Sequence, residues 1–442
     1  MKYDFDEIID RRGTFSMKWD YPELQKHMGI AERFDEETIP VFVADMDFRC
    51  AEPIRQALMR VAEHNIYGYS AVVPEGVGNR YFDAVRGWFS RRHGWEFSAR
   101  DIIYVNGTVE AIRKAIAAFT DPGDGVLMDL PIYYPFMSAV KESGRRVANS
   151  QLVNDGGGYY TFDLNDFEEK ASDPSVKLFL LCSPHNPTGR IWTDEELRAV
   201  ADICRRHGVV IVADEIHGDL IRRGETFRPL AQVCGPEGII TCTAINKTFN
   251  TAGLQATNAV IIDEDLRRRF ITSAGHASPN PFTIAAVTAA YNEGEEWLEQ
   301  LIDYLDGNID FVISYMKEHL PGVKIWRPQG TYILWMDFRG LGLSPEEIRR
   351  RIYVDANVML ESGSMFDPEN GAGFERMCVP APRAVLREAL IALKDQNNCD
   401  FGMHIIPYCH GNGKRAFAYE FNGYWKDVGT LGDRKSTRLN SS

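Results

Sequence analysis

Two kinds of segment alternate between residues 100 and 262. Short runs of β-branched residues and leucine, separated by polar or glycine-containing stretches, predict buried strands. These runs lie at residues 102–105, 126–128, 178–181, 209–212 and 260–262. Amphipathic stretches between several of them predict helices. Strands that alternate with helices indicate an α/β fold, in which a mainly parallel sheet is covered by helices on both faces.

The stretch from residue 193 to residue 208 carries clear helix signals. Thr193 and Glu196 have the spacing of a capping box, which satisfies backbone N–H groups at a helix start. Four apolar residues recur on one face: Leu197, Val200, Ala201 and Cys204. Gly208 suits the helix end, where the backbone commonly turns left-handed.

The pattern changes after residue 285. A long amphipathic stretch over 295–322 predicts a helix, and apolar runs at 323–326 and 332–336 predict strands before a final helix near 382–394. This part of the chain therefore predicts a second, smaller α+β domain. The expected organisation is an N-terminal arm with part of the small domain (1–50), a large domain (51–285) and a small C-terminal domain (286–394).

The composition fits a globular protein of more than one domain. The chain has 442 residues, of which 44% are hydrophobic and 25% charged. No apolar run reaches the ~18 residues of a membrane span, and residues 1–13 lack the hydrophobic core of a secretory signal. The net charge of −14 argues against general binding to nucleic acid or anionic membranes. We expect an enzyme that acts on small molecules.

Cysteine usage points to the compartment. The eight cysteines are spread along the chain and form no Cys-x-x-Cys pair. A disulfide framework and a structural zinc site are therefore both disfavoured, and we expect no metal and a reducing cytoplasm.

Three polar motifs follow apolar strands: SPHNPTGR at 183–190, ADEIHGDL at 213–220 and AINKTFNTAGL at 244–254. Sites in parallel sheets lie at the carboxyl ends of the strands. Lys247 has short polar neighbours, and its amine must lose a proton to attack a carbonyl. Asp214 would be costly to bury unless a cation met it. A protonated pyridine nitrogen would be such a cation, and a lysine with an aspartate of this kind forms the protein half of pyridoxal-phosphate chemistry.

The resemblance to a known family rests on many segments in order. They are FDEIIDRRGTFSMKWD (5–20), VFVADMDF (41–48), NIYGYS (65–70), PIYYPF (131–136), PHNPTGR (184–190), DEIHGDL (214–220), NKTFNTAGL (246–254), GTYILWMD (330–337) and GFERMCVPAPR (373–383). Together they resemble fold-type I pyridoxal-phosphate enzymes of the aminotransferase class I/II superfamily. Within it, the chain is similar to the MalY/PatB-type cystathionine β-lyases, or C–S β-lyases, from Tyr3 to about Lys394.

The resemblance assigns the cofactor, pyridoxal 5′-phosphate, to several residues. Lys247 would bond covalently to the cofactor and then act as the general base on the substrate Cα. Asp214 would keep the pyridine nitrogen protonated, with a helix-capping aspartate as the alternative. Asn186 would hydrogen-bond the phenolic oxygen, although an Asn-Pro turn explains it as well.

Two aromatic positions and one histidine complete the ring contacts implied by the resemblance. His217 lies where many aminotransferases carry a tyrosine, and a histidine there is the lyase-type pattern. Its alternative is a buried histidine of the core. Tyr133 would stack on the pyridine ring, and its neighbour Tyr134 is the alternative for that role.

The phosphate is expected at a strand-to-helix junction. Gly107, Thr108 and Val109 would bind it through backbone N–H groups at a helix N-terminus. The sequence reads Asn-Gly-Thr-Val where the family tends to have Pro-Gly-Val-Val. Tyr69 would reach the phosphate of the neighbouring subunit, because the resemblance implies a homodimer, and an ordinary buried tyrosine is the competing interpretation.

Arg376 would bind the substrate α-carboxylate with its planar guanidinium group. The family usually has asparagine two residues later and cysteine before the Pro-Arg pair, whereas this chain has Cys378 and Ala381. The seven-residue separation of Arg376 from Arg383 is kept. A surface salt bridge is the alternative role.

The implied reaction is β-elimination from a cysteine S-conjugate such as cystathionine, which gives a thiol, pyruvate and ammonia. An aminotransferase on the same scaffold is the first alternative, because fold does not fix function. The second is a cofactor-bound regulator, which the negative charge and the full set of catalytic side chains disfavour.

The C-terminal stretch does not fit this family. Residues 400–430 resemble a fragment of glucose-1-phosphate adenylyltransferases, in which GYWKDVGT lines a sugar-phosphate site and would point to Lys426 and Asp427. Residues 433–442 resemble a translated sequencing adapter. A fragment of about thirty residues cannot bury a core of its own. We interpret 395–442 as a chimeric tail outside the fold, with a fused domain as the alternative.

Overall fold

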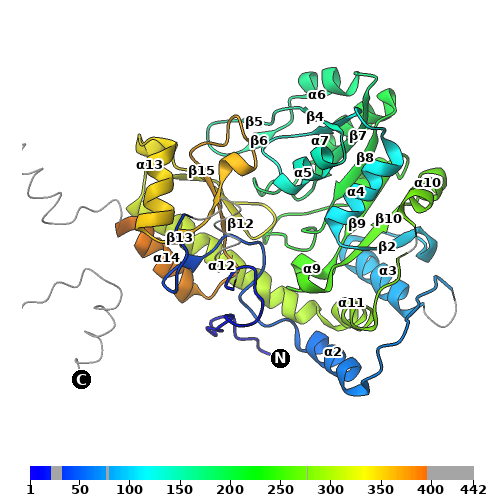
Figure 1. Ribbon diagram of the computed structural model, residues 1–442, viewed down its shortest axis with the longest axis horizontal. Helices are drawn as coiled ribbons and strands as arrows, with labels where there is room; N and C mark the ends of the chain where they lie inside the picture. Colours follow the sequence, from blue (N-terminus) through cyan, green and yellow to red (C-terminus); the bar gives the residue numbers. More distant parts are fainter. Residues whose placement is uncertain (21–31, 76–78, 276, 396–442) are drawn as a thin grey trace, which may run out of the picture. The chain divides into compact units, whose positions relative to one another are not determined.

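The computed structural model describes residues 1–20, 32–75, 79–275 and 277–395, which contain two main sheets (Figure 1). The larger sheet has seven strands in the order β2 (Ile102–Asn106), β10 (Ala256–Val260), β9 (Ile239–Thr243), β8 (Val210–Asp214), β7 (Val176–Cys182), β3 (Gly125–Met128) and β4 (Arg146–Asn149). Neighbouring strands are parallel except where β10 pairs antiparallel with β2 and β9. The predicted α/β fold with a mainly parallel sheet is therefore confirmed.

Apolar side chains cover both faces of this sheet. Along β7, Leu178 and Leu180 pack into one cluster with α4 and α5, whereas Phe179 and Leu181 pack into the cluster on the other face. Such burial on both sides explains why the strands read as continuous apolar runs. The helices of this part are α3 (Arg80–His93), α4 (Thr108–Phe119), α5 (Tyr134–Glu142), α6 (Leu164–Ala171), α7 (Asp194–His207), α8 (Leu230–Cys234), α9 (Ile245–Thr248), α10 (Glu264–Ala274) and α11 (Pro281–Glu293).

The predicted elements match with small shifts. The capping box of Thr193 with Glu196 starts α7, and Gly208 ends it with a φ of 68°. The strand expected at 260–262 is wrong in position, because β10 ends at Val260. Pairing with β2 and β9 sets where β10 ends, and local apolar runs do not carry that information.

The second sheet is antiparallel, with the strand order β11 (Lys324–Ile325), β12 (Ile333–Asp337), β15 (Phe374–Cys378) and β14 (Glu361–Ser362). The helices around it are α12 (Glu295–His319), α13 (Pro345–Arg349), the π-helix η4 (Arg350–Asp355) and α14 (Arg383–Asp395). The long helix and the final helix predicted from the sequence correspond to α12 and α14, which pack against each other.

The N-terminal chain joins the second sheet region. β1 (Ile39–Pro40) pairs in parallel with β13 (Val358–Met359), and Cys378 N–H donates to Val41 O at 2.8 Å. Helix α2 (Glu52–His64) then packs against α11. The remaining short elements are the hairpin β5 (Val153–Asn154) and β6 (Tyr160–Thr161) and the 3-10 turns η1 (Ala99–Asp101), η2 (Ala252–Leu254), η3 (Arg339–Leu341) and η5 (Gly363–Met365).

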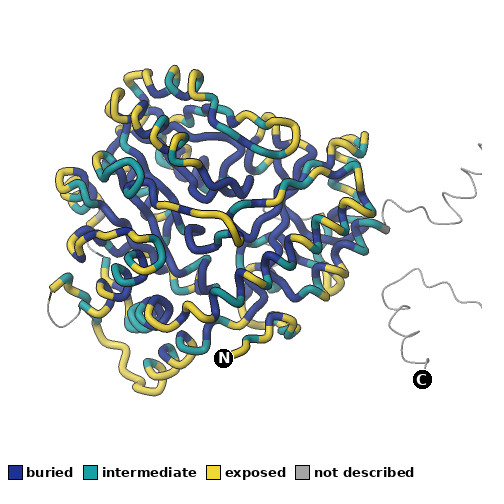
Figure 2. Tube along the Cα trace, turned by 180° about the vertical axis from the view of Figure 1, so that it is seen from behind, coloured by how far each residue is buried: buried dark blue, intermediate teal, exposed yellow. Residues whose placement is uncertain are grey.

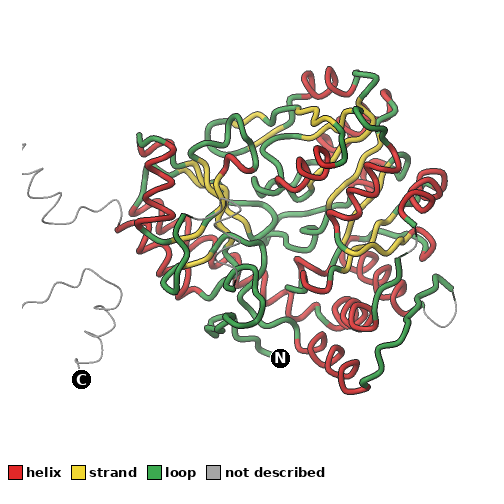
Figure 3. The backbone as a smooth tube through the Cα atoms, in the orientation of Figure 1, coloured by secondary structure: helices red, strands yellow, loops and turns green. Residues whose placement is uncertain are grey.

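Loops gather between the two sheets. Figure 3 shows the loop segments crossing the space between the strands of the larger sheet and those of the smaller one. The central strands of the larger sheet, such as β3, β7 and β9, are almost entirely buried, whereas the stretch after α2 is exposed (Figure 2). Candidate site residues should therefore be sought where the strand ends of the larger sheet meet these loops.

Met1–Gln396 forms one compact unit. The domain boundaries at residues 50, 285 and 394 stay predictions. Of the predicted tail 395–442, Asp395 is the last residue of α14, and 396–442 lie outside the described residues. Within the described part of the chain, no helix has the length and apolar character needed to cross a membrane.

Candidate active site

The three polar motifs leave the same edge of the larger sheet. β7, β8 and β9 are adjacent and parallel, and Asp214 at the end of β8 lies level with Cys182 on one side and Cys242 on the other. The carboxyl ends of these strands therefore bring together the loops after residues 182, 214 and 243.

Lys247 lies on the short helix α9, directly after β9. Its Nζ donates to the carbonyl oxygen of Ala44 at 2.7 Å. Burial lowers the pKa of Lys247, and the positive charge of Arg376 lowers it further, while Asp45 and Asp214 act in the opposite direction. The amine is therefore easier to deprotonate than that of an exposed lysine, as a nucleophile or general base requires.

Asp214 is buried and close enough to Lys247 for each to change the other's pKa. Burial raises the pKa of Asp214 to about 7, although the N–H of Ile216, 3.3 Å from Oδ1, and the charge of Lys247 act against this. A cationic group placed against the carboxyl would hold it ionised.

His217 is buried beside the same strand end. Burial holds its pKa well below the ordinary value, and the charges of Lys247 and Arg376 add to this, so the imidazole is neutral. Its ring meets the ring of Tyr332 edge-to-face with 5.7 Å between centroids. Because Nδ1 has no hydrogen-bonding partner among the described residues, it is available to a ligand.

Tyr133 stands immediately before α5 and packs against the rings of Tyr134 and Phe136. Burial raises its pKa to about 12, and the charges of Arg376 and Asp214 also act on it. The phenol is therefore neutral and lies among the site residues.

Asn186 and Arg376 are hydrogen-bonded to each other. Arg376 lies on β15 and donates from Nη1 to Asn186 Oδ1 at 3.1 Å and from Nη2 to Phe42 O at 3.1 Å. Its guanidinium carbon lies 4.8 Å from the ring centre of Phe366. The alternative of a surface salt bridge is wrong for Arg376, because the side chain is buried.

Glu361 is a residue of this site that the sequence did not reveal. It lies on β14 directly opposite Arg376 on β15, is buried, and forms an ion pair with it. Tyr134 Oη donates to its Oε1 at 3.4 Å. The pairing depends on the β14–β15 register, which gives no local signal in the sequence.

The strand-to-helix junction expected to bind phosphate has the predicted form. β2 ends at Asn106, Gly107 takes a φ of 101°, and α4 begins at Thr108. The hydroxyl of Thr108 forms a hydrogen bond of 3.0 Å with that of Thr257 on β10, so it is already engaged within the chain. That the backbone N–H groups of this junction and of Val109 bind phosphate stays a prediction.

Tyr69 does not share the burial of these residues within one chain. Its side chain is fully exposed, whereas those of Asp214, His217 and Arg376 are buried. The interpretation as an ordinary buried tyrosine is therefore wrong for the single chain, and its contact with a neighbouring subunit stays a prediction.

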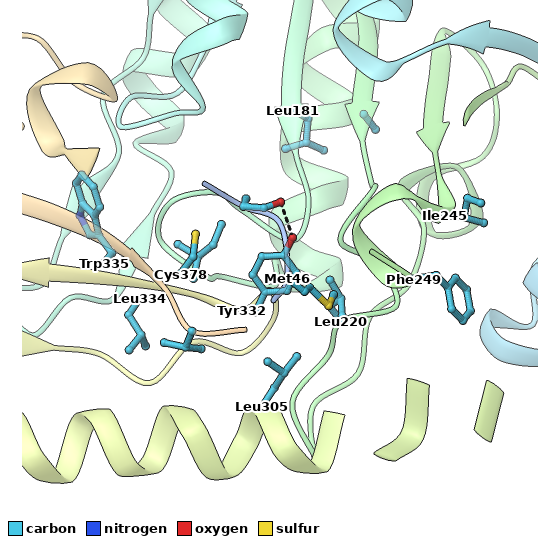
Figure 4. Packing of buried hydrophobic residues seen from close by; sticks show 14 of the residues in the cluster. Met46, Leu181, Leu220, Ile245, Phe249, Leu305, Tyr332, Leu334, Trp335 and Cys378 are labelled. Carbon is cyan, nitrogen blue, oxygen red and sulfur yellow. Dashed lines mark hydrogen bonds between the residues drawn. The ribbon is translucent and has the colours of Figure 1, made fainter. Parts of the chain in front are cut away.

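The segment from residue 41 to residue 48 forms a wall of the site. Ala44 O accepts from Lys247 Nζ and also from Tyr332 Oη at 2.9 Å. Figure 4 shows Met46, Tyr332 and Cys378 packed in one cluster. The sequence marked this segment only as part of the resemblance, because a role played by a backbone carbonyl leaves no side-chain signal.

Ion pairs connect the segment 41–48 to the N-terminal segment that carries Arg11 and Lys18. Lys18 Nζ lies 2.7 Å from Asp47 Oδ2, and Arg11 lies 2.7 Å from Asp47 and 2.8 Å from Asp45. Burial would raise the pKa of Asp47, but the charges of Lys18 and Arg11 hold it below its ordinary value.

Three buried polar atoms of the site have no hydrogen-bonding partner among the described residues. They are His217 Nδ1, Asn246 Oδ1 and Arg376 Nε. Buried polar atoms are normally satisfied, so these atoms favour a polar ligand. Within the described ranges, no group of three or more His, Cys, Asp or Glu residues could hold a metal.

The comparison with known families agrees with this geometry. The model of the family described as aminotransferase class I and II matches residues 54–393. The chain belongs to the aminotransferase class I and II family. Its fold-type I architecture, predicted from the sequence, is thereby confirmed.

Three members of the family illustrate the similarity. Cystathionine beta-lyase PatB of Bacillus subtilis is 38% identical over 396 residues, which cover 88% of this chain and 99% of that protein. The structure of cystalysin from Treponema denticola, which contains pyridoxal 5′-phosphate, gives a TM-score of 0.83 at 32% identity and covers 90% of this chain and 99% of its own. The pyridoxal-phosphate-bound C–S lyase of Staphylococcus hominis gives 0.81 at 31% identity and covers 90% and 98%.

Proposed function

We propose that this protein is a pyridoxal-phosphate-dependent C–S lyase that eliminates the thiol from cysteine S-conjugates such as cystathionine, giving a thiol, pyruvate and ammonia. The observation that carries the proposal is the pair of Lys247 and Asp214, a lysine with a lowered pKa beside a buried carboxyl with a raised one. The description of PatB as a cystathionine beta-lyase and of the S. hominis protein as a C–S lyase supports this activity.

The residues present fit the cofactor. Asp214 would pair with the pyridine nitrogen, because a cation relieves the cost of burying its charge. The unpartnered Nδ1 of His217 and the amide nitrogen of Asn186 would face the ring oxygen, since Asn186 Oδ1 already accepts from Arg376. When bound, pyridoxal phosphate supplies an electron-accepting ring that stabilises negative charge on the substrate Cα.

Two further contacts would fix the cofactor. Tyr133 would stack on the ring, since offset stacking suits flat aromatic groups. The backbone N–H groups of Gly107, Thr108 and Val109 would receive the phosphate at the start of α4, where the helix dipole favours an anion.

The chain's own residues would orient the substrate and move its proton. Arg376 would bind the α-carboxylate through its guanidinium group, of which Nε has no partner among the described residues, and fix the Cα–H bond relative to Lys247. Lys247, bonded covalently to the cofactor and then released, would take the proton from Cα as a neutral amine. Ala44 O would orient that amine through the hydrogen bond that it accepts from Nζ.

A symmetric homodimer would complete the site. Ile66, Tyr67 and Tyr69 expose apolar surface on the stretch after α2, and Ile66 also lines a groove between α2 and α11. A second copy of the chain would cover this surface and let Tyr69 reach the phosphate of its partner's cofactor. The free thiols of the six described cysteines favour a reducing cytoplasm as the compartment.

The test is pyruvate release from cystathionine by the purified holoenzyme with no keto acid added. We expect release by the native protein, and none by Lys247→Ala, which should also lose the near-visible absorption band of the lysine-bound cofactor. Lys170→Ala, a change on α6, is the control. Turnover that requires a keto-acid acceptor would instead make the protein an aminotransferase.

A further inference from the structure

Arg376, the residue proposed to bind the substrate carboxylate, already pairs with a carboxylate of the chain, that of Glu361. Glu361 and Arg376 are directly opposite residues of β14 and β15, so their side chains point to the same face of the sheet. Both side chains are buried, and they form an ion pair. Arg376 also donates to Asn186 Oδ1 and to Phe42 O, which leaves Nε as the buried donor without a partner among the described residues.

This arrangement raises a charge problem for any substrate that carries a carboxylate. The pair of Glu361 and Arg376 is neutral as a unit. A second carboxylate at Arg376 would place two negative charges next to one buried cation, in a part of the protein where charges are weakly screened. Two carboxyl groups that share one site do not both ionise, because the charge of each disfavours the charge of the other.

We propose that Glu361 is a specificity-determining residue that competes with the substrate carboxylate for Arg376 and takes up one proton from solvent when the substrate binds. In the free enzyme, ionised Glu361 holds Arg376 in place. On binding, the substrate carboxylate takes over the guanidinium contacts, and neutral Glu361 keeps its contact with Tyr134. The inference rests on the proposed function only in taking an amino acid as the substrate.

The groups around Glu361 agree with a carboxyl that can become neutral. Burial raises its pKa, and the charges of Arg376 and Lys247 lower it. The titratable and charged groups that act on Glu361 or are acted on by it are Arg376, Glu375 and Cys378 on β15, Tyr133 and Tyr134 at the start of α5, Lys247 on α9 and Tyr353 on η4. A substrate carboxylate at Arg376 offsets the larger of the two positive charges that favour the ionised form of Glu361.

The probe for the test is 3-(methylthio)propionate, which has the carboxylate and the sulfur of a substrate but no amino group and therefore undergoes no turnover. Its binding to the holoenzyme is measured by calorimetry in two buffers of different ionisation enthalpy, which gives the number of protons taken up. We expect about one proton per molecule bound at pH 8, and an affinity that falls about tenfold per pH unit where Glu361 is ionised.

Two variants isolate the residue. Glu361→Gln keeps the shape of the side chain and should bind the probe without that proton, at least tenfold more tightly than the native enzyme at pH 8. Glu375→Gln is the matched control, since Glu375 is a buried carboxyl one residue from Arg376 whose side chain bonds Tyr353. It should behave like the native protein.

Three results would overturn the proposal: binding to the native holoenzyme without proton uptake, uptake that persists unchanged in Glu361→Gln, or weaker binding by Glu361→Gln than by the native enzyme. Thermal unfolding of each variant checks that it is folded. A failure of the proposed function is a separate outcome, because it would appear as the absence of pyruvate release while the proton count remains measurable.

Discussion

Asp214 sets the electrostatics of the site at the scale of single residues. Its carboxyl is buried at a strand end, and its pKa of about 7 lies well above the ordinary value of about 3.9. Between these two values the folded chain binds more protons than the unfolded chain. The stability that Asp214 contributes is therefore fully present below pH ~4 and is lost as the pH rises through ~7.

Asp214→Asn should flatten this dependence in the cofactor-free protein. We expect the free energy of unfolding of the native apoprotein to fall between pH 4 and pH 7 by about 3–4 kcal/mol more than that of the variant. Urea denaturation across this range measures the difference. Asp202→Asn, at an exposed position on α7, is the control and should follow the native curve. Equal slopes for all three proteins would contradict the burial effect assigned to Asp214.

Single residues were predictable where a strand end and a side-chain type coincided. Lys247, Asp214 and His217 follow apolar strands, and the structure brings them together. Glu361 was not predictable, because its meeting with Arg376 depends on which strands pair and in which register. The role of Ala44 was not predictable either, because its backbone carbonyl accepts the hydrogen bond from Lys247 and its side chain takes no part.

At the scale of elements, the loop after β7 is held by a close approach to the loop before β12. Gly189 O accepts from the N–H groups of Gln329 and Gly330 at 2.8 and 3.0 Å. Gly189 has a φ of +72°, and a Cβ built on it would lie 2.3 Å from Pro328 Cβ. The glycine is therefore required both by its backbone conformation and by the lack of space.

Gly189→Ala should separate these two requirements when it is compared with Gly208→Ala. Gly208 has a similar φ of +68°, but an added Cβ there meets nothing within 4 Å. We expect about 1 kcal/mol of destabilisation for Gly208→Ala and about 3 kcal/mol or more for Gly189→Ala, because crowding is added. Equal losses in chemical denaturation would show that the two loops are not tightly packed.

The ion cluster of Arg11, Lys18, Asp45 and Asp47 is the second feature that stabilises the site at this scale. Lys18→Met should destabilise the fold by about 2–3 kcal/mol, since it leaves Asp47 buried with Arg11 as its one remaining close charge partner among the described residues. It should also speed cofactor release, because the cluster holds the segment that carries Ala44. Guanidinium denaturation and the loss of near-visible absorbance measure the two effects.

Lys170→Met provides the comparison for Lys18→Met. Lys170 pairs with Asp166 one helical turn away on the surface of α6, and such pairs contribute about 0.5 kcal/mol or less. A loss of similar size for both variants would mean that the cluster around Asp47 adds no stability beyond that of a surface pair.

Periodic elements were predictable and aperiodic ones were not. Helix α7 has its start signal, its apolar face and its stop signal within sixteen residues, from Thr193 to Gly208. The segment from residue 41 to residue 48 has no comparable repeat, and its course is set by hydrogen bonds to residues such as Cys378 and Asn250. Contacts of this kind cannot be deduced from the local pattern.

At the scale of the whole molecule, the exposed stretch after α2 favours an interface with a second copy of the chain. Ile66, Tyr67, Tyr69 and Val73 all expose large apolar side chains there. Exposed apolar side chains gathered on one stretch of a globular protein commonly mark an interface. The dimer proposed above would bury these side chains.

Ile66→Asp should convert the dimer into monomers, because a charge would be buried against an apolar surface. Light scattering measures the mass. A separate variant, Tyr69→Phe, shows whether retention of the cofactor depends on the tyrosine hydroxyl. Leu164→Asp, at an exposed position on α6 away from this stretch, should leave the mass unchanged. A native protein with the mass of one chain would contradict the proposed assembly and the role of Tyr69.

The order in which the chain is made has a consequence for when this enzyme becomes active. Val41 O accepts a hydrogen bond from the N–H of Cys378, and Ile39 pairs with Val358. The residues of each pair are separated by more than three hundred positions in the sequence. A ribosome adds about 5–20 residues per second, so the early segment waits on the order of half a minute for its partners to emerge. A nascent chain therefore cannot complete this wall of the site before residue 378 has emerged, and the coenzyme can be held there only after that point.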